Sequence, residues 1–232
     1  MAIHHVFIIP DGNRRWATAN NVPIETGYLR GVEKMLDVAA WCKEFSVGTL
    51  SLWGFSTENF DRSAKEKEFL FSIFEHKADE LLSSKKYDEY GVRIRFLGEL
   101  SKFPESLNSK FRQLEEFTKN KSQYALNIFM GYGGRQELVH AVQALAVDVK
   151  SGSFSADDID EQKIESKLYT HGLPDPDLII RTSGEKRLSG ALPWQSIYSE
   201  LYFSEACWPD FSKKDFQAAI DDFYSRQRRF GR

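Results

Sequence analysis

Short apolar segments alternate with longer amphipathic segments along this 232-residue chain, and no other feature constrains its fold as strongly. The apolar runs have the length of buried strands, and the segments between them carry apolar residues at helical spacing. Strands joined through helices indicate βαβ crossovers and a sheet covered on both faces. The predicted strands are 5–9, 49–55, 92–97, 125–130, 178–180 and 200–203. The predicted helices are 27–45, 64–84, 104–118, 136–149 and 213–225.

These elements predict an α/β protein with one domain over residues 1–232, built on a mainly parallel six-stranded sheet flanked by helices. The net charge of −3 gives no support for nucleic-acid binding. Cys42 and Cys207 lie far apart and lack metal-ligand spacing, which argues against a disulfide framework or a zinc site. No run approaches the roughly 20 apolar residues of a membrane span, and the first apolar run is too short for a signal peptide. We therefore expect a cytoplasmic protein without a transmembrane segment.

The segment from Pro10 to Trp16, directly after the first predicted strand, carries the strongest chemical signal. Asp11 offers the carboxylate that Mg²⁺ prefers beside phosphate oxygens. Gly12 lets the backbone approach a ligand closely, and the N–H groups after it can hold phosphate. The alternative is an ordinary turn that ends a strand, because Asp-Gly and Asn are common turn residues. This segment by itself leaves both interpretations open.

Three predicted loops bring arginines to one edge of the sheet. Ligands of such sheets collect beyond the carboxyl ends of the strands, where the loops after the first, second and fifth strands meet. A single arginine there is most simply a solvated surface charge. Five guanidinium groups together would repel one another without a polyanion, and their forked donors suit phosphate oxygens. The five residues are Arg14, Arg15, Arg62, Arg181 and Arg187.

Several segments, in order, resemble the cis-prenyltransferases, the family that includes undecaprenyl diphosphate synthase. The matching segments are 11–17 (DGNRRWA), 55–60 (FSTENF), 131–135 (GYGGR), 181–189 (RTSGEKRLS), 194–211 and the terminal 229–231. The motifs are highly specific and extend over almost the whole chain. The resemblance implies the family's fold and a condensation reaction. In that reaction an allylic diphosphate loses its diphosphate, isopentenyl diphosphate attacks, and proton loss leaves a Z double bond.

The resemblance also assigns roles to individual residues. It implies that Asp11 is catalytic and works with Mg²⁺ at the allylic diphosphate, that Asn59 is catalytic, and that Glu200 is a second metal-linked carboxylate. Because a neutral amide is a very poor base, we expect Asn59 to orient a diphosphate oxygen while the released diphosphate takes the proton. The implied substrate-binding residues are Gly12, Asn13, Arg14, Arg15, Trp16, Ser56, Thr57, Glu58, Phe60, Arg62, Arg181, Arg187, Leu188 and Ser189, with Arg229 and Gly231 reaching across a homodimer interface.

The chain departs from the family pattern near the allylic site. Many members have an Arg and a His where this chain has Ile24 and Tyr28, and Arg30 is close enough to compensate. Segment 190–193 (GALP) also differs. Two alternatives to Z elongation therefore stay open. One is an irregular condensation of two dimethylallyl diphosphates, and the other is a catalytically silent partner subunit, which the retained motif residues argue against.

Large side chains predict a short product. In the family the product tunnel runs between the sheet and the helices, and bulky residues shorten it. The bulky residues here are Tyr124, Phe129 and Met130 on the fourth strand and Phe69, Phe71 and Phe74 on the second helix. We expect a product of about C10 to C20 rather than a C55 lipid carrier, although ordinary core packing explains the same residues. The acidic run 157–161 is interpreted as a helix N-terminus rather than a metal motif.

Overall fold

The computed structural model describes residues 2–84 and 91–226. All six predicted strands are present: β1 (His5–Ile9), β2 (Thr49–Ser56), β3 (Val92–Leu97), β4 (Tyr124–Tyr132), β5 (Leu178–Arg181) and β6 (Glu200–Phe203). The five predicted helices are α2 (Ile24–Glu44), α3 (Ala64–Ser83), α5 (Glu105–Thr118), α6 (Gly134–Lys150) and α8 (Lys213–Ser225). The short helix α1 (Asn13–Ala19) was not predicted, whereas α7 (Glu161–Glu165) follows the acidic run that was interpreted as a helix N-terminus.

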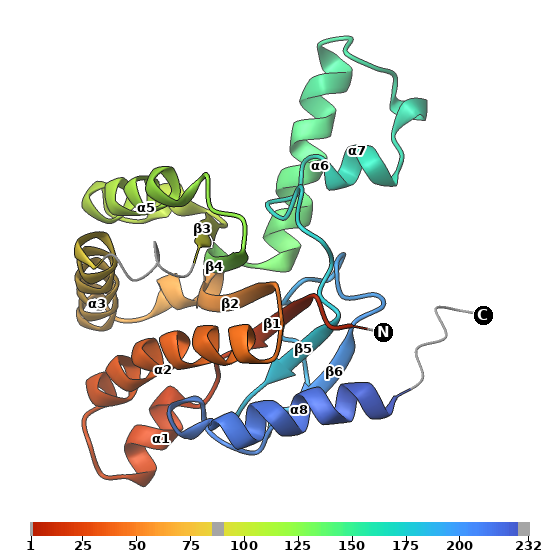
Figure 1. Ribbon diagram of the computed structural model, residues 1–232. Helices are drawn as coiled ribbons and strands as arrows, with labels where there is room; N and C mark the ends of the chain where they lie inside the picture. The colour runs from red at the N-terminus through yellow and green to blue at the C-terminus, as the bar shows by residue number, and fades with distance from the viewer. Residues whose placement is uncertain (1, 85–90, 227–232) are drawn as a thin grey trace.

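The six strands form one sheet in the order β3-β4-β2-β1-β5-β6, and every neighbouring pair is parallel. The predicted mainly parallel sheet is thus confirmed. The order reverses at β1, which lies between β2 and β5 (Figure 1). The loops that leave the carboxyl ends of β1, β2 and β5 are therefore neighbours, which is the arrangement that places ligand sites in such sheets.

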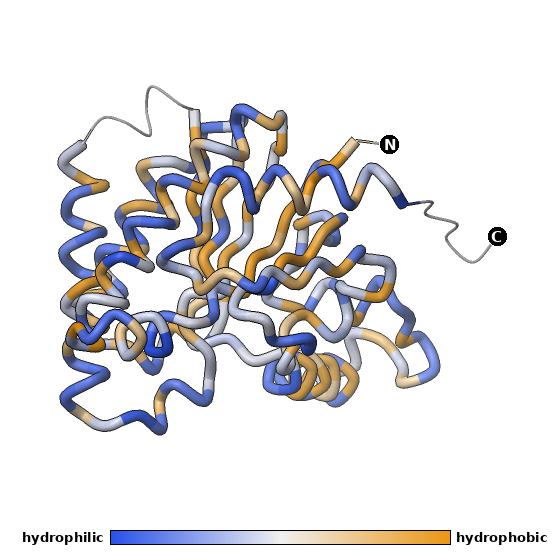
Figure 2. Tube along the Cα trace, turned by 90° about the horizontal axis from the view of Figure 1, so that it is seen from below, coloured by the Kyte–Doolittle hydropathy of each residue, from blue (hydrophilic) through white to orange (hydrophobic). Residues whose placement is uncertain are grey.

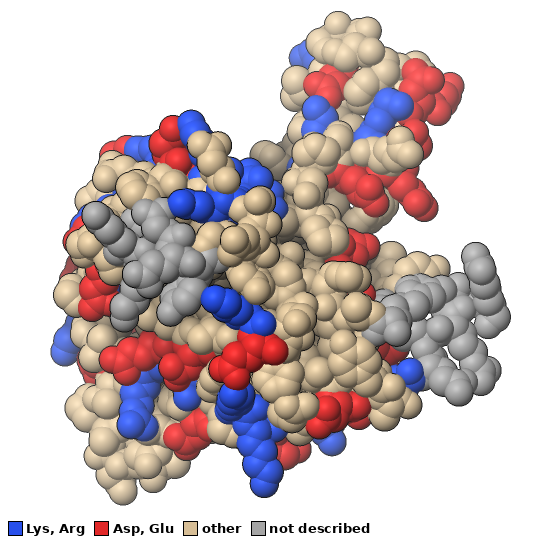
Figure 3. All heavy atoms as spheres, viewed as in Figure 1, with Lys and Arg blue, Asp and Glu red and all other residues tan. Residues whose placement is uncertain are grey.

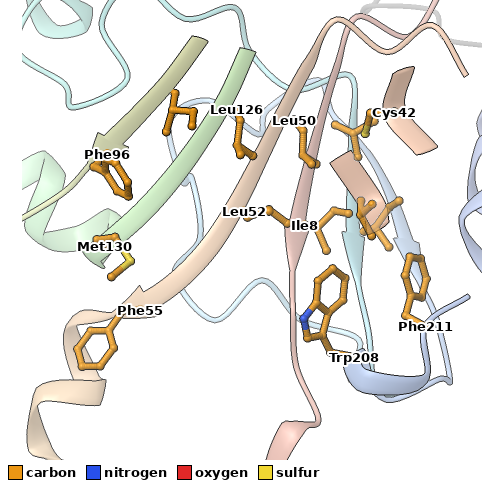
Figure 4. Packing of buried hydrophobic residues seen from close by; sticks show 14 of the residues in the cluster. Ile8, Cys42, Leu50, Leu52, Phe55, Phe96, Leu126, Met130, Trp208 and Phe211 are labelled. Carbon is orange, nitrogen blue, oxygen red and sulfur yellow. The ribbon is translucent and has the colours of Figure 1, made fainter. Parts of the chain in front are cut away.

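Alternating side chains of the central strand enter two separate hydrophobic clusters. Val6 and Ile8 belong to the larger cluster, to which α2, α3, α5 and α8 contribute, and Phe7 and Ile9 belong to a smaller one on the other face. Figure 4 shows the larger cluster, in which the Trp208 indole lies beside Ile8. Figure 2 shows the hydrophobic strands at the centre and hydrophilic residues toward the periphery. With both faces covered, the central strand β1 is buried at every position, as expected of a parallel sheet.

Short polar side chains set where several helices begin. The Ser63 hydroxyl accepts the backbone N–H of Glu66 at the start of α3, and Ser212 forms a capping box with Asp215 at the start of α8. Within the acidic run, Asp160 caps α7 by accepting the N–H of Lys163. The prediction that this run is a helix N-terminus is confirmed.

Helices α6 and α7 extend away from the sheet (Figure 1). Val139, Val142 and Val147 on α6 are 56–65% exposed, which is unusual for β-branched apolar side chains. Within the described residues, no helix is both long and apolar enough to cross a bilayer. The cytoplasmic location stays a prediction.

Candidate active site

The loop after β1 turns sharply into a helix. Gly12 has φ +102°, a left-handed conformation that favours glycine, and helix α1 begins at the next residue. A Cβ at Gly12 would lie 2.8 Å from the Ser183 hydroxyl oxygen, so the loops after β1 and β5 are in close contact here. The predicted loop at Asn13 to Trp16 is therefore the first turn of a helix. The sequence did not reveal this because a seven-residue helix shows little periodicity.

Asp11 is held by two arginines at this edge of the sheet. Its Oδ2 accepts a hydrogen bond from Arg181 Nη2 at 2.9 Å and lies 3.4 Å from Arg15 Nη2. Partial burial by itself would raise the pKa of the Asp11 carboxyl. The hydrogen bond and charge of Arg181, together with Arg15, outweigh burial and hold that pKa below its ordinary value. Asp11 therefore stays ionised, as a metal-binding carboxylate must.

Arg181 joins two loops from the last position of β5. It is only 5% exposed, and its Nη1 donates to the Ser189 hydroxyl at 2.7 Å and to the Arg187 carbonyl at 2.5 Å. Together with the bond to Asp11, these contacts fix the segment after β5 against the end of β1. Ser189 itself has φ +51°, so this segment is held in a strained conformation.

Glu185 connects two of the predicted phosphate-binding arginines, although the sequence did not single it out. Its carboxylate accepts a hydrogen bond from Arg15 Nη1 at 3.0 Å and pairs with Arg187. Arg15 also donates to the Ser183 carbonyl at 3.1 Å. The only sequence signal for Glu185 was its position two residues before Arg187 in one predicted ligand loop.

The loop after β2 forms a short 3₁₀ helix, η1 (Thr57–Asp61), which determines where its polar residues lie. Asn59 Oδ1 accepts the backbone N–H of Ser56 at 3.0 Å and so caps this helix. Glu58 is exposed, while the Thr57 hydroxyl is buried without a hydrogen-bond partner among the described residues. Phe60 packs in an aromatic cluster, with its ring centroid 4.9 Å from that of Phe55 and 5.1 Å from that of Phe103. The predicted substrate-binding role of Phe60 would therefore be an apolar contact.

Arg62 follows η1 and is held by the side chain that departs from the family pattern. Its Nη1 donates to the Tyr28 hydroxyl at 2.6 Å and lies 2.9 Å from Glu66 Oε1. The sequence did not indicate the contact with Tyr28, because Tyr28 on α2 is 34 residues away from Arg62. Ile24 is on the same helix and 36% exposed.

The other residues predicted for the first loop divide into buried and exposed groups. Trp16 is buried and Arg30 lies over its ring, 5.1 Å from the centroid, whereas Arg14 is exposed. Asn13 donates to the Pro10 carbonyl at 3.2 Å. Leu188, on the loop after β5, packs against the smaller hydrophobic cluster.

The structure does not bring Glu200 to Asp11. Glu200 begins β6 and pairs with Leu178, which pairs with Val6, so it lies at the amino end of the sheet while Asp11 lies beyond the carboxyl end. Its carboxylate is bonded instead to Arg226, at 2.8 Å. Within the described residues of one copy, Asp11 and Glu200 therefore do not share a metal site, and the metal-linked role of Glu200 stays a prediction. Arg229 and Gly231, also predicted to bind substrate, lie outside the described residues.

Carboxylates pair with most of the arginines that were predicted at the carboxyl edge of the sheet, which we call the rim. The expectation of uncompensated guanidinium groups is corrected for Arg15, Arg62, Arg181 and Arg187, because Asp11, Glu66 and Glu185 pair with them. Lys and Arg are likewise largely interspersed with Asp and Glu on the face seen in Figure 3.

Comparison with known proteins matches this chain to a family. A family model described as "Putative undecaprenyl diphosphate synthase" matches residues 9–231. The tritrans,polycis-undecaprenyl-diphosphate synthase (geranylgeranyl-diphosphate specific) of Thermoplasma volcanium is 45% identical over 228 residues, covering 98% of this chain and 88% of the relative. The enzyme of the same name from Methanocaldococcus jannaschii is 43% identical over 230 residues, covering 98% and 82%.

Solved structures agree with the fold. Lavandulyl diphosphate synthase from Lavandula x intermedia, in complex with dimethylallyl diphosphate, has a TM-score of 0.93 and 32% identity, covering 100% of this chain and 99% of that one. A probable undecaprenyl diphosphate synthase from Campylobacter jejuni has a TM-score of 0.80 and 32% identity, covering 100% of both chains.

Proposed function

Because this chain belongs to the cis-prenyltransferase family, we propose that it condenses an allylic diphosphate with isopentenyl diphosphate to a Z-configured prenyl diphosphate and releases diphosphate. The observation that carries the proposal is the ionised Asp11 held by Arg181 and Arg15 at the carboxyl edge of the sheet. Charge builds on the leaving diphosphate in the transition state, so cations fixed beforehand stabilise that state more than the ground state.

Asp11 also fits a divalent metal. It is a single ionised carboxylate with 31% of its side chain exposed, and Mg²⁺ prefers one or two carboxylates together with substrate phosphates over a cage of protein ligands. When bound, Mg²⁺ would neutralise charge on the departing diphosphate. Arg181 holds the carboxylate in place, while Arg15, Arg187 and Arg62 supply guanidinium groups for the phosphate oxygens.

Asn59 supports an orienting role better than a role as base. A base would need the amide oxygen, and that oxygen already accepts the Ser56 N–H. The amide nitrogen can donate to a diphosphate oxygen, with the released diphosphate taking the proton. We expect Asn59→Ala to lose most activity. A Z product formed at a near-normal rate by this variant would contradict both roles.

The reaction is tested by supplying dimethylallyl, geranyl, farnesyl and geranylgeranyl diphosphates to the purified protein, each with and without isopentenyl diphosphate and with Mg²⁺. We expect a Z product that requires isopentenyl diphosphate, and its loss in Asp11→Asn, which keeps the shape of the side chain but removes its charge. Absence of any condensation product with every combination would overturn the proposal and favour a silent partner subunit.

Product length rests on the packing around η1. The rings of Phe55, Phe60, Phe71 and Phe103 lie 4.9–5.7 Å apart and form one aromatic cluster where β2, η1 and α3 meet. Phe129 does not contribute, because it packs in the smaller cluster on the other face. We therefore propose a product of about C10 to C20, the range expected from the bulky side chains.

The relatives are named for a longer product, undecaprenyl diphosphate, and for a geranylgeranyl starter. Chromatography of the products from the four allylic diphosphates decides between a short product and a product of undecaprenyl length. A main product of C50 or longer, or activity with geranylgeranyl diphosphate and with none of the shorter allylic diphosphates, would refute the short product. Neither result would contradict the proposed reaction class.

Irregular condensation is the second candidate, because the chain resembles lavandulyl diphosphate synthase, solved with dimethylallyl diphosphate, at a TM-score of 0.93. The replaced positions Ile24 and Tyr28 support it. It predicts a ten-carbon product from dimethylallyl diphosphate alone. A strict requirement for isopentenyl diphosphate would exclude it.

The exposed valines of α6 support a homodimer. Val139, Val142 and Val147 give this projecting helix an apolar surface that a second copy of the chain would cover. The family resemblance implies a homodimer in which Arg229 and Gly231 reach a diphosphate across the interface. We expect Val142→Glu to convert the protein to a monomer by analytical ultracentrifugation and to lower its activity. An unchanged sedimentation coefficient would argue against this surface.

A further inference from the structure

The Tyr28 hydroxyl lies between the two charged groups of an ion pair. It donates to Glu66 Oε1 at 2.5 Å and accepts a hydrogen bond from Arg62 Nη1 at 2.6 Å, while Arg62 and Glu66 are 2.9 Å apart. The three residues come from α2, the end of η1 and the first turns of α3. One hydroxyl therefore connects three separate elements.

The hydroxyl is fixed in this role by its surroundings. Tyr28 is 7% exposed, and burial, together with the hydrogen bond to Glu66, raises the pKa of its hydroxyl, so it remains a donor. The hydroxyl donates its hydrogen to Glu66 and accepts a hydrogen bond from Arg62, so both contacts fix its position. The side chain is better placed to act on Arg62 than to bind a ligand itself.

The arrangement leaves part of the Arg62 guanidinium available. Both contacts use Nη1, and Nη2 has no hydrogen bond to the described part of the chain. The guanidinium carbon also lies 5.6 Å from the centroid of the Tyr28 ring, so the ring packs beside the guanidinium. The side chain of Arg62 is 24% exposed. A guanidinium held on one side and open on the other is prepared for an anion.

Tyr28 lies beside the helix that follows Asp11. The neighbouring Gly27 packs on the first turn of α1, where a Cβ at Gly27 would lie 2.4 Å from the Asn13 carbonyl oxygen. The charge of Arg14 in α1 also acts to lower the pKa of the Tyr28 hydroxyl, against the larger effect of burial. Arg62 itself directly follows the 3₁₀ helix that Asn59 caps. An anion bound by Arg14 and Arg62 would thus lie between the loops after β1 and β2.

We propose that Tyr28 is a positioning residue, which together with Glu66 holds Arg62 in the orientation that receives the diphosphate of the allylic substrate. The inference rests on the proposed function. The hydroxyl lowers the cost of ordering a flexible arginine, since a side chain fixed before binding loses less freedom when the ligand arrives. Without Tyr28, the Glu66 side chain could move together with Arg62 into other orientations. The Tyr28 ring is buried and cannot move in this way.

Steady-state kinetics of Tyr28→Phe test the proposal, with Tyr169→Phe as a matched control outside the site. Loss of a hydrogen bond to a charged group is expected to raise KM for the allylic diphosphate about tenfold, with KM for isopentenyl diphosphate changed less than about twofold. A purely structural role would change both constants together. Thermal unfolding establishes that each variant is folded.

A double-mutant cycle separates action through Arg62 from a direct contact. Titration with inorganic pyrophosphate and Mg²⁺ is measured calorimetrically for the wild type, Tyr28→Phe, Arg62→Gln and the double variant. If Tyr28 acts through Arg62, then Tyr28→Phe weakens pyrophosphate binding about tenfold when Arg62 is present. In the protein that carries Arg62→Gln, the same substitution has no further effect.

Equal pyrophosphate affinities of wild type and Tyr28→Phe, or additive effects in the double variant, would overturn the proposal. These titrations do not depend on turnover. A protein that makes no prenyl product would therefore contradict the proposed function, while the role of Tyr28 would still be decided by the titrations.

Discussion

Acidification is expected to weaken this fold through His5, a buried histidine at the start of the central strand. Its side chain has 2% exposure, Nδ1 lies 2.7 Å from the Pro174 carbonyl, and Nε2 lies 2.7 Å from the Ser51 hydroxyl. A carbonyl only accepts, so Nδ1 carries the hydrogen and Nε2 accepts from Ser51. Asn127 in turn donates to Ser51, so a neutral imidazole completes a buried network across three strands.

Burial lowers the pKa of His5 from 6.5 to about 4, against the opposing effects of Pro174 and Asp177. Between these values the unfolded chain binds a proton that the folded protein does not, so stability falls as the pH falls. The whole interval corresponds to about 3 kcal/mol. At pH 5 the unfolded imidazole is almost fully protonated and the folded one about a tenth protonated, so about 2 kcal/mol is lost by then.

Urea unfolding of wild type and His5→Gln at pH 7.5 and pH 5 measures this contribution. The variant has a neutral side chain at both pH values, and the other titrating groups are common to both proteins. The wild type should therefore lose about 2 kcal/mol more than the variant on acidification. Equal losses would show that His5 is not kept neutral by the fold and would refute the reasoning.

Three further variants test the site. Arg181→Lys should lower kcat/KM about 100-fold or more, since one ammonium cannot contact Asp11 and the loop after β5 together; a change below about threefold would contradict this. Glu185→Gln should tighten the binding of inorganic pyrophosphate several-fold by calorimetry, because the carboxylate competes for Arg15; weaker binding would instead mean that Glu185 orders the site. Gly12→Ala should cost about 1–3 kcal/mol in urea unfolding, because its left-handed backbone lies against the loop after β5; unchanged stability would show that the loop adapts.

The structure brings together only some of the residues that the resemblance assigned to the site, and it shows why others lie elsewhere. Asp11, Arg15, Arg181 and Arg187 meet at one edge, as the positions of the strand ends predict. Glu200 does not join them, because a motif gives the residue but not the end of the strand on which it lies.

The alternation of apolar and amphipathic segments determined the strands, the main helices and the parallel class of the sheet, because periodicity and burial are local properties of the chain. The same local logic placed Asp11 directly after a buried strand. Only the tertiary structure decided the strand order and the charge pairing. Glu185 meets Arg15 across 170 residues and Tyr28 meets Arg62 across 34, and such contacts depend on how separate elements pack. The sequence therefore determined which groups reach the rim, and the fold decided which of them are compensated and which can receive a diphosphate.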